Sequence, residues 1–343
     1  MDIFNLNFFE VLQPQTVKEA CQILSADPEN AIVIGGGTDL LSLIKDGIQR
    51  PRKLVSLTSI TGLSGIRFGS TIRIGASTTL DTISRNSKFG HIFPSVSKAI
   101  TSIGTQQIRN VATLGGNLCQ RPRCLYFRAV DSHCLKQGGK QCNAVNGYNK
   151  NLAIFQGGPA HIVHNSDSAP ALIASNAQIE ITGEQGSRTI LLEDFFVNPR
   201  TTLKQETILG IGEIATAVYI PRPQPGTTSM YLKIKSRNGD DFALVNLALQ
   251  TQVLDHRIRS IHLIAGNVAP KPYRVQAVEN HLMGKLLPNI DTTEIMNLLL
   301  ETAHPLSSNG YKIPLLANLI RSAVEKLKTE NYVTKEDEND KQI

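Results

Sequence analysis

The sequence predicts an α+β fold in two domains, and three observations lead to this expectation. The chain has 343 residues, and at roughly 150 residues per domain this length fits two or three domains. Short β-branched runs alternate with segments of helical periodicity. Residues 221–228 read PRPQPGTT, and this cluster of prolines and a glycine is the strongest linker signal in the chain. We therefore expect a first domain at 1–223 and a second at 224–328.

The composition limits the class of protein. Apolar residues make up 41% of the chain and the formal net charge is +6, which suits ordinary buried cores. No apolar run approaches the ~18 residues of a membrane span, and the basic residues form no stripe that indicates nucleic-acid binding. The start, MDIFNLNFFEVLQ, has no basic region and no cleavage site. We expect a cytoplasmic protein without membrane insertion or a nucleic-acid partner; export with a signal-bearing partner stays open.

The end of the chain has a different character. Residues 329–343 contain five acidic side chains, two lysines and almost nothing apolar. A segment with so little to bury does not offset the entropy lost on ordering. We therefore predict a disordered acidic tail at 329–343.

A strand, a glycine triplet and a helix are predicted near the start. Ala31–Ile34 is a short β-branched run typical of a buried strand, and three glycines at 35–37 end it. Thr38 suits the N-cap of a helix over residues 40–44. Residues 53–57 form a second strand, so the predicted unit is β-loop-α-β.

The remaining elements are predicted from the same periodicities. The loop-like segment 120–160 carries most of the cysteines. Strands are expected at 66–68, 71–74 and 178–181, strands or mixed elements at 231–234, 242–249 and 261–265, and helices at 79–84, 94–102, 274–286, 293–303 and 311–328.

Two glycine loops suggest a phosphate site. The glycines after the first strand place backbone N–H groups and a helix N-terminus around one point, which favours an anion. The pattern matches neither GxGxxG nor a Walker loop, so those two templates do not apply. A second glycine pair follows about 80 residues later, in TLGGN at 113–117. Two such loops suit a diphosphate held between two subdomains, although a glycine triplet alone is also an ordinary turn.

The cysteines are concentrated in one region. Cys119, Cys124, Cys134 and Cys142 lie within a short stretch, while Cys21 stands apart. Without an export signal, disulfides are not expected. From spacing alone, a metal or iron–sulfur site and a set of structural thiols both remain open.

A series of motifs resembles one known family. The stretch IGGGTDLL at 34–41 and the stretch QIRN at 107–110 running into ATLGGN at 112–117 are similar to the flavin (medium) subunits of the molybdenum hydroxylases. This xanthine dehydrogenase family includes aldehyde oxidoreductases, carbon monoxide dehydrogenases and 4-hydroxybenzoyl-CoA reductases. Shorter motifs follow in the family's order along nearly the whole chain. These are RIGA at 73–76, SD at 166–167, DFF at 194–196, SR at 236–237 with Asp241, NVAP at 267–270 and YKI at 311–313.

The resemblance implies a fold and a set of FAD-binding residues. The fold is a two-subdomain FAD-binding domain of the vanillyl-alcohol-oxidase/PCMH type, with subdomains 1–60 and 61–223, followed by a small α+β domain of the CO dehydrogenase flavoprotein type. The cysteine region is an insertion at 119–160. The implied FAD contacts are Val33, Ile34, Gly35, Gly36, Gly37, Thr38, Asp39, Leu40, Ile103, Thr113, Leu114, Gly115, Gly116, Asn117, Asp167, Leu209 and Lys233.

Part of the family carries an extra [4Fe-4S] cluster in this insertion, held by four thiolates. Cys124, Cys134 and Cys142 match three of its ligands, whereas Ala160 stands where the fourth is found. Three interpretations stay open: Cys119 completes the set, His161 ligates through nitrogen, or the cluster is absent and the cysteines are a relic. We favour a cluster completed by Cys119 or His161.

The resemblance also implies a function. No side chain has the pattern of a substrate-processing acid, base or nucleophile, as expected where a cofactor carries the redox chemistry. The implied role is an FAD-binding electron-transfer subunit of a multi-subunit molybdenum hydroxylase. Electrons would pass from a large molybdenum-cofactor subunit through a small [2Fe-2S] subunit to FAD, and on to NAD⁺, oxygen or a carrier protein. The alternatives are a stand-alone flavin oxidoreductase and a cofactor-less assembly protein.

Overall fold

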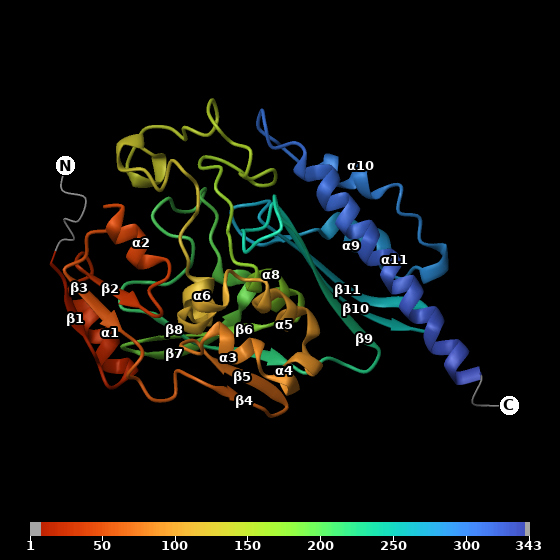
Figure 1. Ribbon diagram of the computed structural model, residues 1–343, viewed down its shortest axis with the longest axis horizontal. Helices are drawn as coiled ribbons and strands as arrows, with labels where there is room; N and C mark the ends of the chain where they lie inside the picture. The colour runs from red at the N-terminus through yellow and green to blue at the C-terminus, as the bar shows by residue number, and fades with distance from the viewer. Residues whose placement is uncertain (1–7, 340–343) are drawn as a thin grey trace.

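The computed structural model describes residues 8–339 and contains three sheets with helices between and around them (Figure 1). The strands are β1 (Glu10–Leu12), β2 (Ala31–Ile34), β3 (Lys53–Ser56), β4 (Ile66–Arg67), β5 (Thr71–Gly75), β6 (Gln178–Gly183), β7 (Gly186–Leu191), β8 (Ile214–Pro221), β9 (Thr227–Ile234), β10 (Val245–Leu254), β11 (Arg257–Gly266) and β12 (Tyr273–Arg274). The helices are α1 (Val17–Ala26), α2 (Leu40–Lys45), α3 (Leu80–Ser84), α4 (Ser87–Ile92), α5 (Pro94–Thr101), α6 (Gln106–Val111), α7 (Leu114–Leu118), α8 (Ser168–Ala174), α9 (Gln276–Leu282), α10 (Ile295–Leu300) and α11 (Lys312–Asn339), with short 3₁₀ turns η1 (Val130–Ser132), η2 (Leu135–Gln137), η3 (Leu192–Phe195) and η4 (Leu287–Asn289).

The first sheet is small and parallel, in the order β1-β3-β2. It confirms the strands predicted around the glycine triplet. The helix α1, which the sequence analysis did not predict, packs against it through buried Ala20, Cys21 and Leu24. Thr16 is the N-cap of α1, because its hydroxyl accepts from the Glu19 amide, and the Glu19 carboxylate accepts from the Gln15 amide; this local pattern was available in the sequence.

The second sheet is antiparallel, in the order β4-β5-β8-β6-β7. Helices α3, α5 and α8 share one apolar core with it. Its central strand β8 is almost entirely buried, yet neither β8 nor β7 was predicted. Residues on both faces of β8 are buried, since Val218 packs in the core of this sheet and Ile214 in the core with α1. The strand therefore lacks the alternation of a half-exposed strand.

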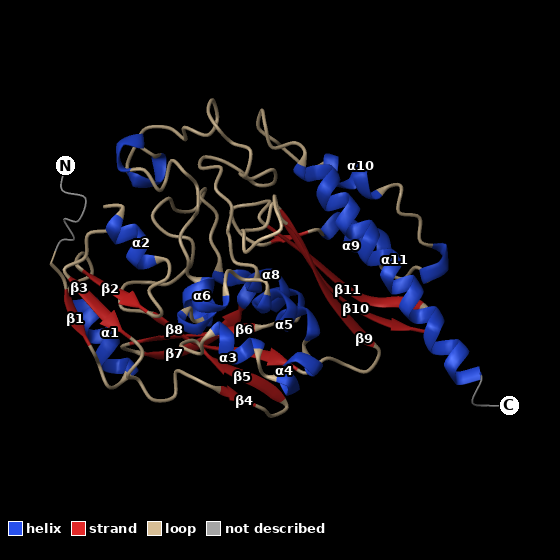
Figure 2. Ribbon diagram, viewed as in Figure 1, coloured by secondary structure: helices blue, strands red, loops and turns tan. Residues whose placement is uncertain are grey.

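The third sheet has the order β12-β11-β10-β9 and lies between two layers of helices (Figure 2). Alternate residues of β10 face opposite sides, since Leu247 and Leu249 pack in the core with α9, α10 and α11, whereas Ala248 packs in the core of the first domain. Helices α5 and α8 of the first domain therefore cover one face of the C-terminal sheet. Side chains of this sheet can reach the first domain directly.

The start of α2 and the end of α11 differ from the sequence predictions. The N-cap of α2 is Asp39 rather than Thr38, and no side chain caps this helix. Helix α11 runs to Asn339, so the backbone of residues 329–339 is helical where the acidic composition predicted disorder; the sequence there has no proline or glycine to end a helix. The predicted tail's last residues, 340–343, lie outside the described part.

Within residues 8–339, none of the helices has both the length and the apolar character that a bilayer span requires.

Candidate cofactor cleft and the cysteine loop

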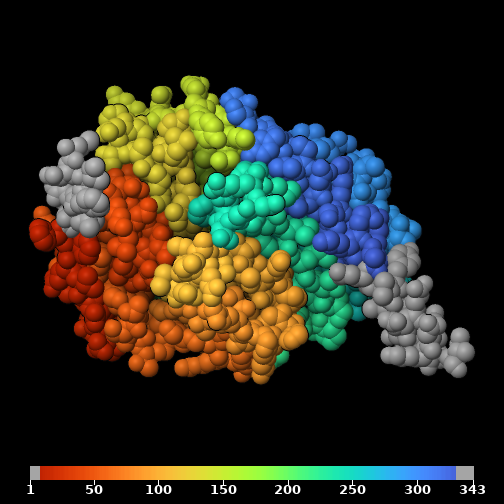
Figure 3. Space-filling view, viewed as in Figure 1, coloured from red at the N-terminus to blue at the C-terminus, as the bar shows by residue number. Residues whose placement is uncertain are grey.

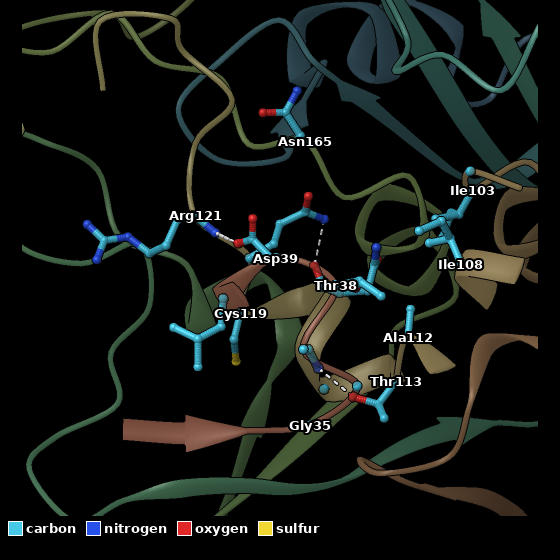
Figure 4. A pocket seen from close by; sticks show the side chains of 18 of the residues that line it. Gly35, Thr38, Asp39, Ile103, Ile108, Ala112, Thr113, Cys119, Arg121 and Asn165 are labelled. Atoms are coloured by element: carbon cyan, nitrogen blue, oxygen red, sulfur yellow. Dashed lines mark hydrogen bonds between the residues drawn. The ribbon is translucent and has the colours of Figure 1, made fainter. Parts of the chain in front are cut away.

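A cleft of about 530 Å³ lies where the small parallel sheet, the second sheet and the C-terminal domain meet. Its size is within the range of small-molecule and cofactor sites. Every residue implied as an FAD contact lines it except Ile34 and Leu114. Figure 4 shows both glycine loops and the side chains of Asp39, Ile103 and Thr113 around the same space.

The first glycine loop presents free backbone donors. Within residues 8–339, the amides of Gly35, Gly36, Gly37 and Thr38 donate no hydrogen bond. The loop ends at the start of α2, and its residues line the cleft together with Leu40, the first residue of that helix. Unpaired amides at the entrance to a helix suit a phosphate oxygen, and the donor set therefore fits a diphosphate.

The glycines also allow the two loops to touch. A Cβ at Gly36 would overlap the carbonyl oxygen of Val111, and one at Gly35 would lie 2.8 Å from Thr113 Oγ1. Gly37 has a φ of +72°, which side chains rarely adopt. Glycine at 36 is thus required by the neighbouring backbone, a reason that the sequence analysis did not anticipate.

The second loop is mostly saturated by its own contacts. Thr113 caps α7 by accepting from the Gly116 amide at 3.1 Å, and the Gly115 amide donates to Ala76 O at 2.8 Å. Asn117 Oδ1 accepts from the hydroxyls of Ser166 and Ser168 at 2.6 and 2.7 Å. This loop supports the first loop and shapes the cleft, and it offers fewer free donors than the sequence analysis expected.

Asp167 and Lys233 form a buried ion pair on the cleft wall. Lys233 Nζ lies 2.7 Å from Asp167 Oδ2, with the side chains 6% and 4% exposed. Tyr231 Oη and Asn246 Nδ2 each donate to Asp167 Oδ1 at 2.8 Å. Burial, followed by the charge of Asp167, raises the pKa of Tyr231 well above its usual value, so this phenol keeps its proton and acts as a donor.

Three arginines that the sequence analysis did not single out surround Asp39. The carboxylate accepts from the Arg121 amide at 2.8 Å, from Arg128 Nη2 at 2.7 Å and from Arg123 Nη2 at 3.0 Å. Arg121 and Arg123 line the cleft, and Arg123 also stacks on Phe242 with its guanidinium 5.0 Å from the ring centroid. Figure 3 shows the turn between β9 and β10, in cyan, next to the cysteine loop, in yellow. In the sequence, the only indication of these arginines was their spacing, RPRC-x₃-R, directly after a glycine loop.

The cysteine loop is tied to the rest of the molecule by buried charges. Lys136 Nζ and Arg121 Nε lie 2.9 and 2.6 Å from the carboxylate of Glu206. Farther along, the fully buried Lys312 donates to the carbonyls of Asn151, Leu152 and Asn267 at 2.7–3.1 Å. The loop is thus an ordered part of the fold.

Three of the loop's cysteines lie together. Cys124, Cys134 and Cys142 belong to one small apolar cluster. Burial raises the pKa of the Cys124 and Cys134 thiols, while amides of the following residues donate toward them and oppose that rise. Amides that point at a sulfur atom stabilise a thiolate, so this cluster has one feature of a ligand set.

The two candidates for a fourth ligand, Cys119 and His161, lie in different surroundings. Cys119 lines the cofactor cleft and packs against the core of the first domain, and burial raises its pKa to about 12. Its position follows from α7, which ends at Leu118 against the second sheet. His161 Nδ1 has no hydrogen-bond partner in the described residues. Within residues 8–339 no group of three or more His, Cys, Asp or Glu side chains is arranged to hold a metal ion.

Two family models match consecutive parts of the chain. The model described as "FAD binding domain in molybdopterin dehydrogenase" matches residues 7–223. The model described as "CO dehydrogenase flavoprotein C-terminal domain" matches residues 230–327.

Several characterised proteins are similar over most of their length. The aldehyde oxidoreductase FAD-binding subunit PaoB of Escherichia coli K12 is 33% identical over 85% of this chain and 89% of its own. The glyceraldehyde dehydrogenase medium chain of Sulfolobus acidocaldarius is 26% identical over 81% of this chain and 82% of its own.

Solved structures share the fold. A chain of Cu,Mo-CO dehydrogenase superposes with a TM-score of 0.73 at 23% identity, covering 94% of this chain and 98% of that chain. A chain of quinoline 2-oxidoreductase from Pseudomonas putida 86 gives 0.72 at 20% identity, covering 94% and 98%.

Proposed function

Because the chain belongs to the family of FAD-binding domains of molybdopterin dehydrogenases, we propose that its cleft holds FAD for electron transfer within a multi-subunit molybdenum hydroxylase. FAD accepts two electrons and passes them on to an acceptor, so the bound cofactor supplies the redox chemistry. The protein's own residues bind it, orient it and set its electrostatic surroundings.

The observation that carries this proposal is the set of free amides in the first glycine loop. Gly35 to Thr38 offer donors at the start of α2, inside a cleft of suitable size. The diphosphate of FAD would take these donors, with Asp39 held in place by its arginines. The second loop, through Thr113 and Gly116, would fix the distance between the two walls.

The other end of the cleft suits the flavin ring. Ile103 and Leu209 give apolar walls and Lys233 gives a cationic edge. An apolar site with few polar groups excludes water and holds a flat ring in one orientation. Five acidic side chains line the cleft, and four of them (Asp39, Asp167, Glu213 and Asp241) are each paired with a cationic side chain. Carboxylates held in ion pairs are poorly placed to act on a separate substrate, which favours an electron-transfer subunit over a stand-alone oxidoreductase.

The direct test is the visible spectrum of the purified chain under anaerobic conditions, before and after chemical reduction. We expect resolved flavin bands that bleach on reduction, with about one FAD per chain after acid release. A chain that binds no flavin would refute the proposal and favour a cofactor-less assembly protein. A chain with flavin that oxidises small substrates unaided would favour the stand-alone enzyme.

We also propose that Cys124, Cys134 and Cys142 supply thiolates to an iron–sulfur cluster in the cysteine loop. The burial of Cys124 and Cys134, the packing of the partly buried Cys142 against the same cluster and the amides donating toward the first two support this. Because the described residues hold no preformed set of three or more ligands, cluster binding would have to draw the three cysteines together. A complete set then needs Cys119 or His161 to move, or leaves one iron without a protein ligand.

Iron analysis tests the cluster. Cys124→Ser should remove most of the iron while FAD remains bound, and Cys21→Ser, which changes a buried cysteine outside the loop, should leave both. Ala160→Cys should raise iron per chain by adding a fourth thiolate, whereas Ala177→Cys at equal burial should not. Iron that persists at full occupancy in Cys124→Ser would contradict the assignment.

The partners follow from the family. We propose that the chain assembles with a large molybdenum-cofactor subunit and a small [2Fe-2S] subunit, in the cytoplasm. Affinity purification of the full chain from its own cells, followed by mass spectrometry, should recover both partners in equal amounts. Recovery of the chain alone from gently lysed cells would contradict the heteromeric assembly.

A further inference from the structure

Asp167 is held by three side chains of the C-terminal domain. Oδ1 accepts from Tyr231 Oη and Asn246 Nδ2, both at 2.8 Å, and Oδ2 accepts from Lys233 Nζ at 2.7 Å. Tyr231 and Lys233 lie on β9 and Asn246 on the adjacent β10, whereas Asp167 lies at the start of α8 in the first domain. One buried carboxylate thus joins the two domains beside the cleft.

Asp167 and Lys233, the two members of this network that line the cleft, differ in how many further hydrogen bonds they can make. Oδ1 of Asp167 already receives two donors, so only Oδ2 has room for another. Lys233 Nζ donates to Asp167 and to Ser102 O at 2.9 Å. An ammonium has three donors, which leaves one for a ligand in the cleft. Lys233 is therefore better placed than Asp167 to meet the cofactor.

Tyr231 and Asn246 do not line the cleft, so any effect they have on a ligand must pass through Asp167. We propose that these two are positioning residues: they fix the Asp167 carboxylate, which holds the Lys233 ammonium on the cleft wall as the countercharge for reduced FAD. This inference rests on the proposed function. It differs from the sequence analysis, in which Asp167 itself contacts FAD.

The proposed role of Lys233 requires only its positive charge. Reduction of FAD to its anionic reduced form takes up two electrons and one proton and leaves one negative charge on the ring. The electrons come from the iron–sulfur donor of the complex and the proton from solvent, so Lys233 gives up neither. A poorly hydrated ammonium stabilises that negative charge more strongly than an exposed one. Its influence depends on how completely Asp167 neutralises it.

The hydrogen bonds that Asp167 Oδ1 accepts determine how strongly the carboxylate neutralises Lys233. A carboxylate that receives two hydrogen bonds from neutral donors is less basic and attracts an ammonium less strongly. Removing one donor should draw Lys233 closer to Asp167 and weaken its interaction with the flavin. The reduction potential of bound FAD should then fall, although no cleft residue has been changed.

The test is the two-electron reduction potential of FAD bound to the full chain. Tyr231→Phe keeps the ring and removes the hydroxyl, and we expect at least a tenfold change in the redox equilibrium, about 30 mV more negative. Tyr273→Phe is the matched control, because Tyr273 lies on β12 of the same sheet and its hydroxyl contacts Thr302, outside the network. Lys233→Met should give a larger fall, and Lys233→Arg should stay close to the unchanged chain.

The outcomes separate this inference from the proposed function. A fall in potential in Tyr231→Phe and in Asn246→Leu at unchanged FAD content, without a fall in Tyr273→Phe, supports the positioning role. Potentials that do not move, or that fall equally in the control, overturn it even where stability drops. Absence of FAD from the unchanged chain would instead refute the proposed function. Should one network variant fail to fold, the other decides.

Discussion

The cofactor cleft and the cysteine loop are neighbours that depend on different kinds of sequence information. The cleft is built largely from backbone: free amides at 35–38, close contact between two loops and a few apolar walls. The proposed cluster in the cysteine loop would depend on four specific side chains, and Ala160 stands at one of the ligand positions that the resemblance implies. A backbone site tolerates change in most side chains, whereas a four-ligand site loses a ligand to one substitution.

The difference also appears in how each region is held. The cleft residues belong to short elements with local caps, such as Thr113 on α7. The cysteine loop has little regular structure and is anchored by buried charged groups, Lys136 with Glu206 and Lys312 with three carbonyls. The loop therefore remains part of the fold whether or not it holds a metal.

The largest effect is expected at Gly36. In Gly36→Ala the new methyl group would overlap the carbonyl oxygen of Val111, so the two glycine loops must separate. We expect FAD per chain to fall from about one to nearly zero after gel filtration. Gly239→Ala is the control, because nothing lies within 4 Å of that position. Normal FAD content in Gly36→Ala would show that loop contact does not form the site.

The glycine loops also show what the sequence predicted well. Strands β2 and β3 and helix α5 were predicted within a residue or two, because their apolar periodicity and glycine or proline boundaries are local. The resemblance named seventeen positions, and the structure brings all but Ile34 and Leu114 to one cleft. Short local motifs carried this information.

The rest depended on long-range contacts. Strand β8 is central only because β5 and β6 pair with it. Tyr231 and Asn246 gain a role because β9 and β10 cross α8, and neither residue stands in a recognisable motif. Cys119 is near the other cysteines in sequence, but α7 takes it to the cleft instead. Sequence proximity was a poor guide wherever a helix or sheet fixed the direction of the chain.

The next effect concerns the anchor of the cysteine loop. Lys312→Met would leave the carbonyls of Asn151 and Asn267 without their buried donor, whereas Leu152 O keeps its bond from Asn309 Nδ2. Leaving such groups unsatisfied should lower the free energy of unfolding by roughly 3 kcal/mol. Urea unfolding checks this, with the partly exposed Lys328→Met as control. A loss below about 1 kcal/mol would show that the loop needs no such anchor.

A pH effect is expected at His164, between the loop and the cleft. Its Nε2 faces Leu118 O at 3.2 Å and its Nδ1 accepts from the Ser166 amide. Burial lowers its pKa to about 4. The unfolded chain binds a proton near pH 6.5 and the folded chain does not, so stability falls as the pH drops from 7 toward 4. Between pH 7 and pH 5 this should amount to about 2 kcal/mol.

The variant His164→Gln isolates that effect. A glutamine does not titrate, so the loss of unfolding free energy between pH 7 and pH 5 should be smaller by about the same amount. The comparison of slopes removes the contribution of other histidines and of carboxylates. Identical pH dependence in the two proteins would mean that folding does not lower the pKa of His164.

The smallest effect separates cleft geometry from helix stability. Thr113→Ala removes the cap of α7, and Thr16→Ala removes an equivalent cap of α1, each with a 3.1 Å hydrogen bond. Each loss should cost about 1 kcal/mol of stability. Only Thr113 lines the cleft, so only its variant should weaken FAD binding, by about fivefold if the full amount appears in affinity. Titration of the apoprotein with FAD measures this. Equal FAD affinities in Thr113→Ala and Thr16→Ala would mean that the second loop stabilises the fold but does not contribute to FAD binding. The free amides of the first loop would then account for the binding alone.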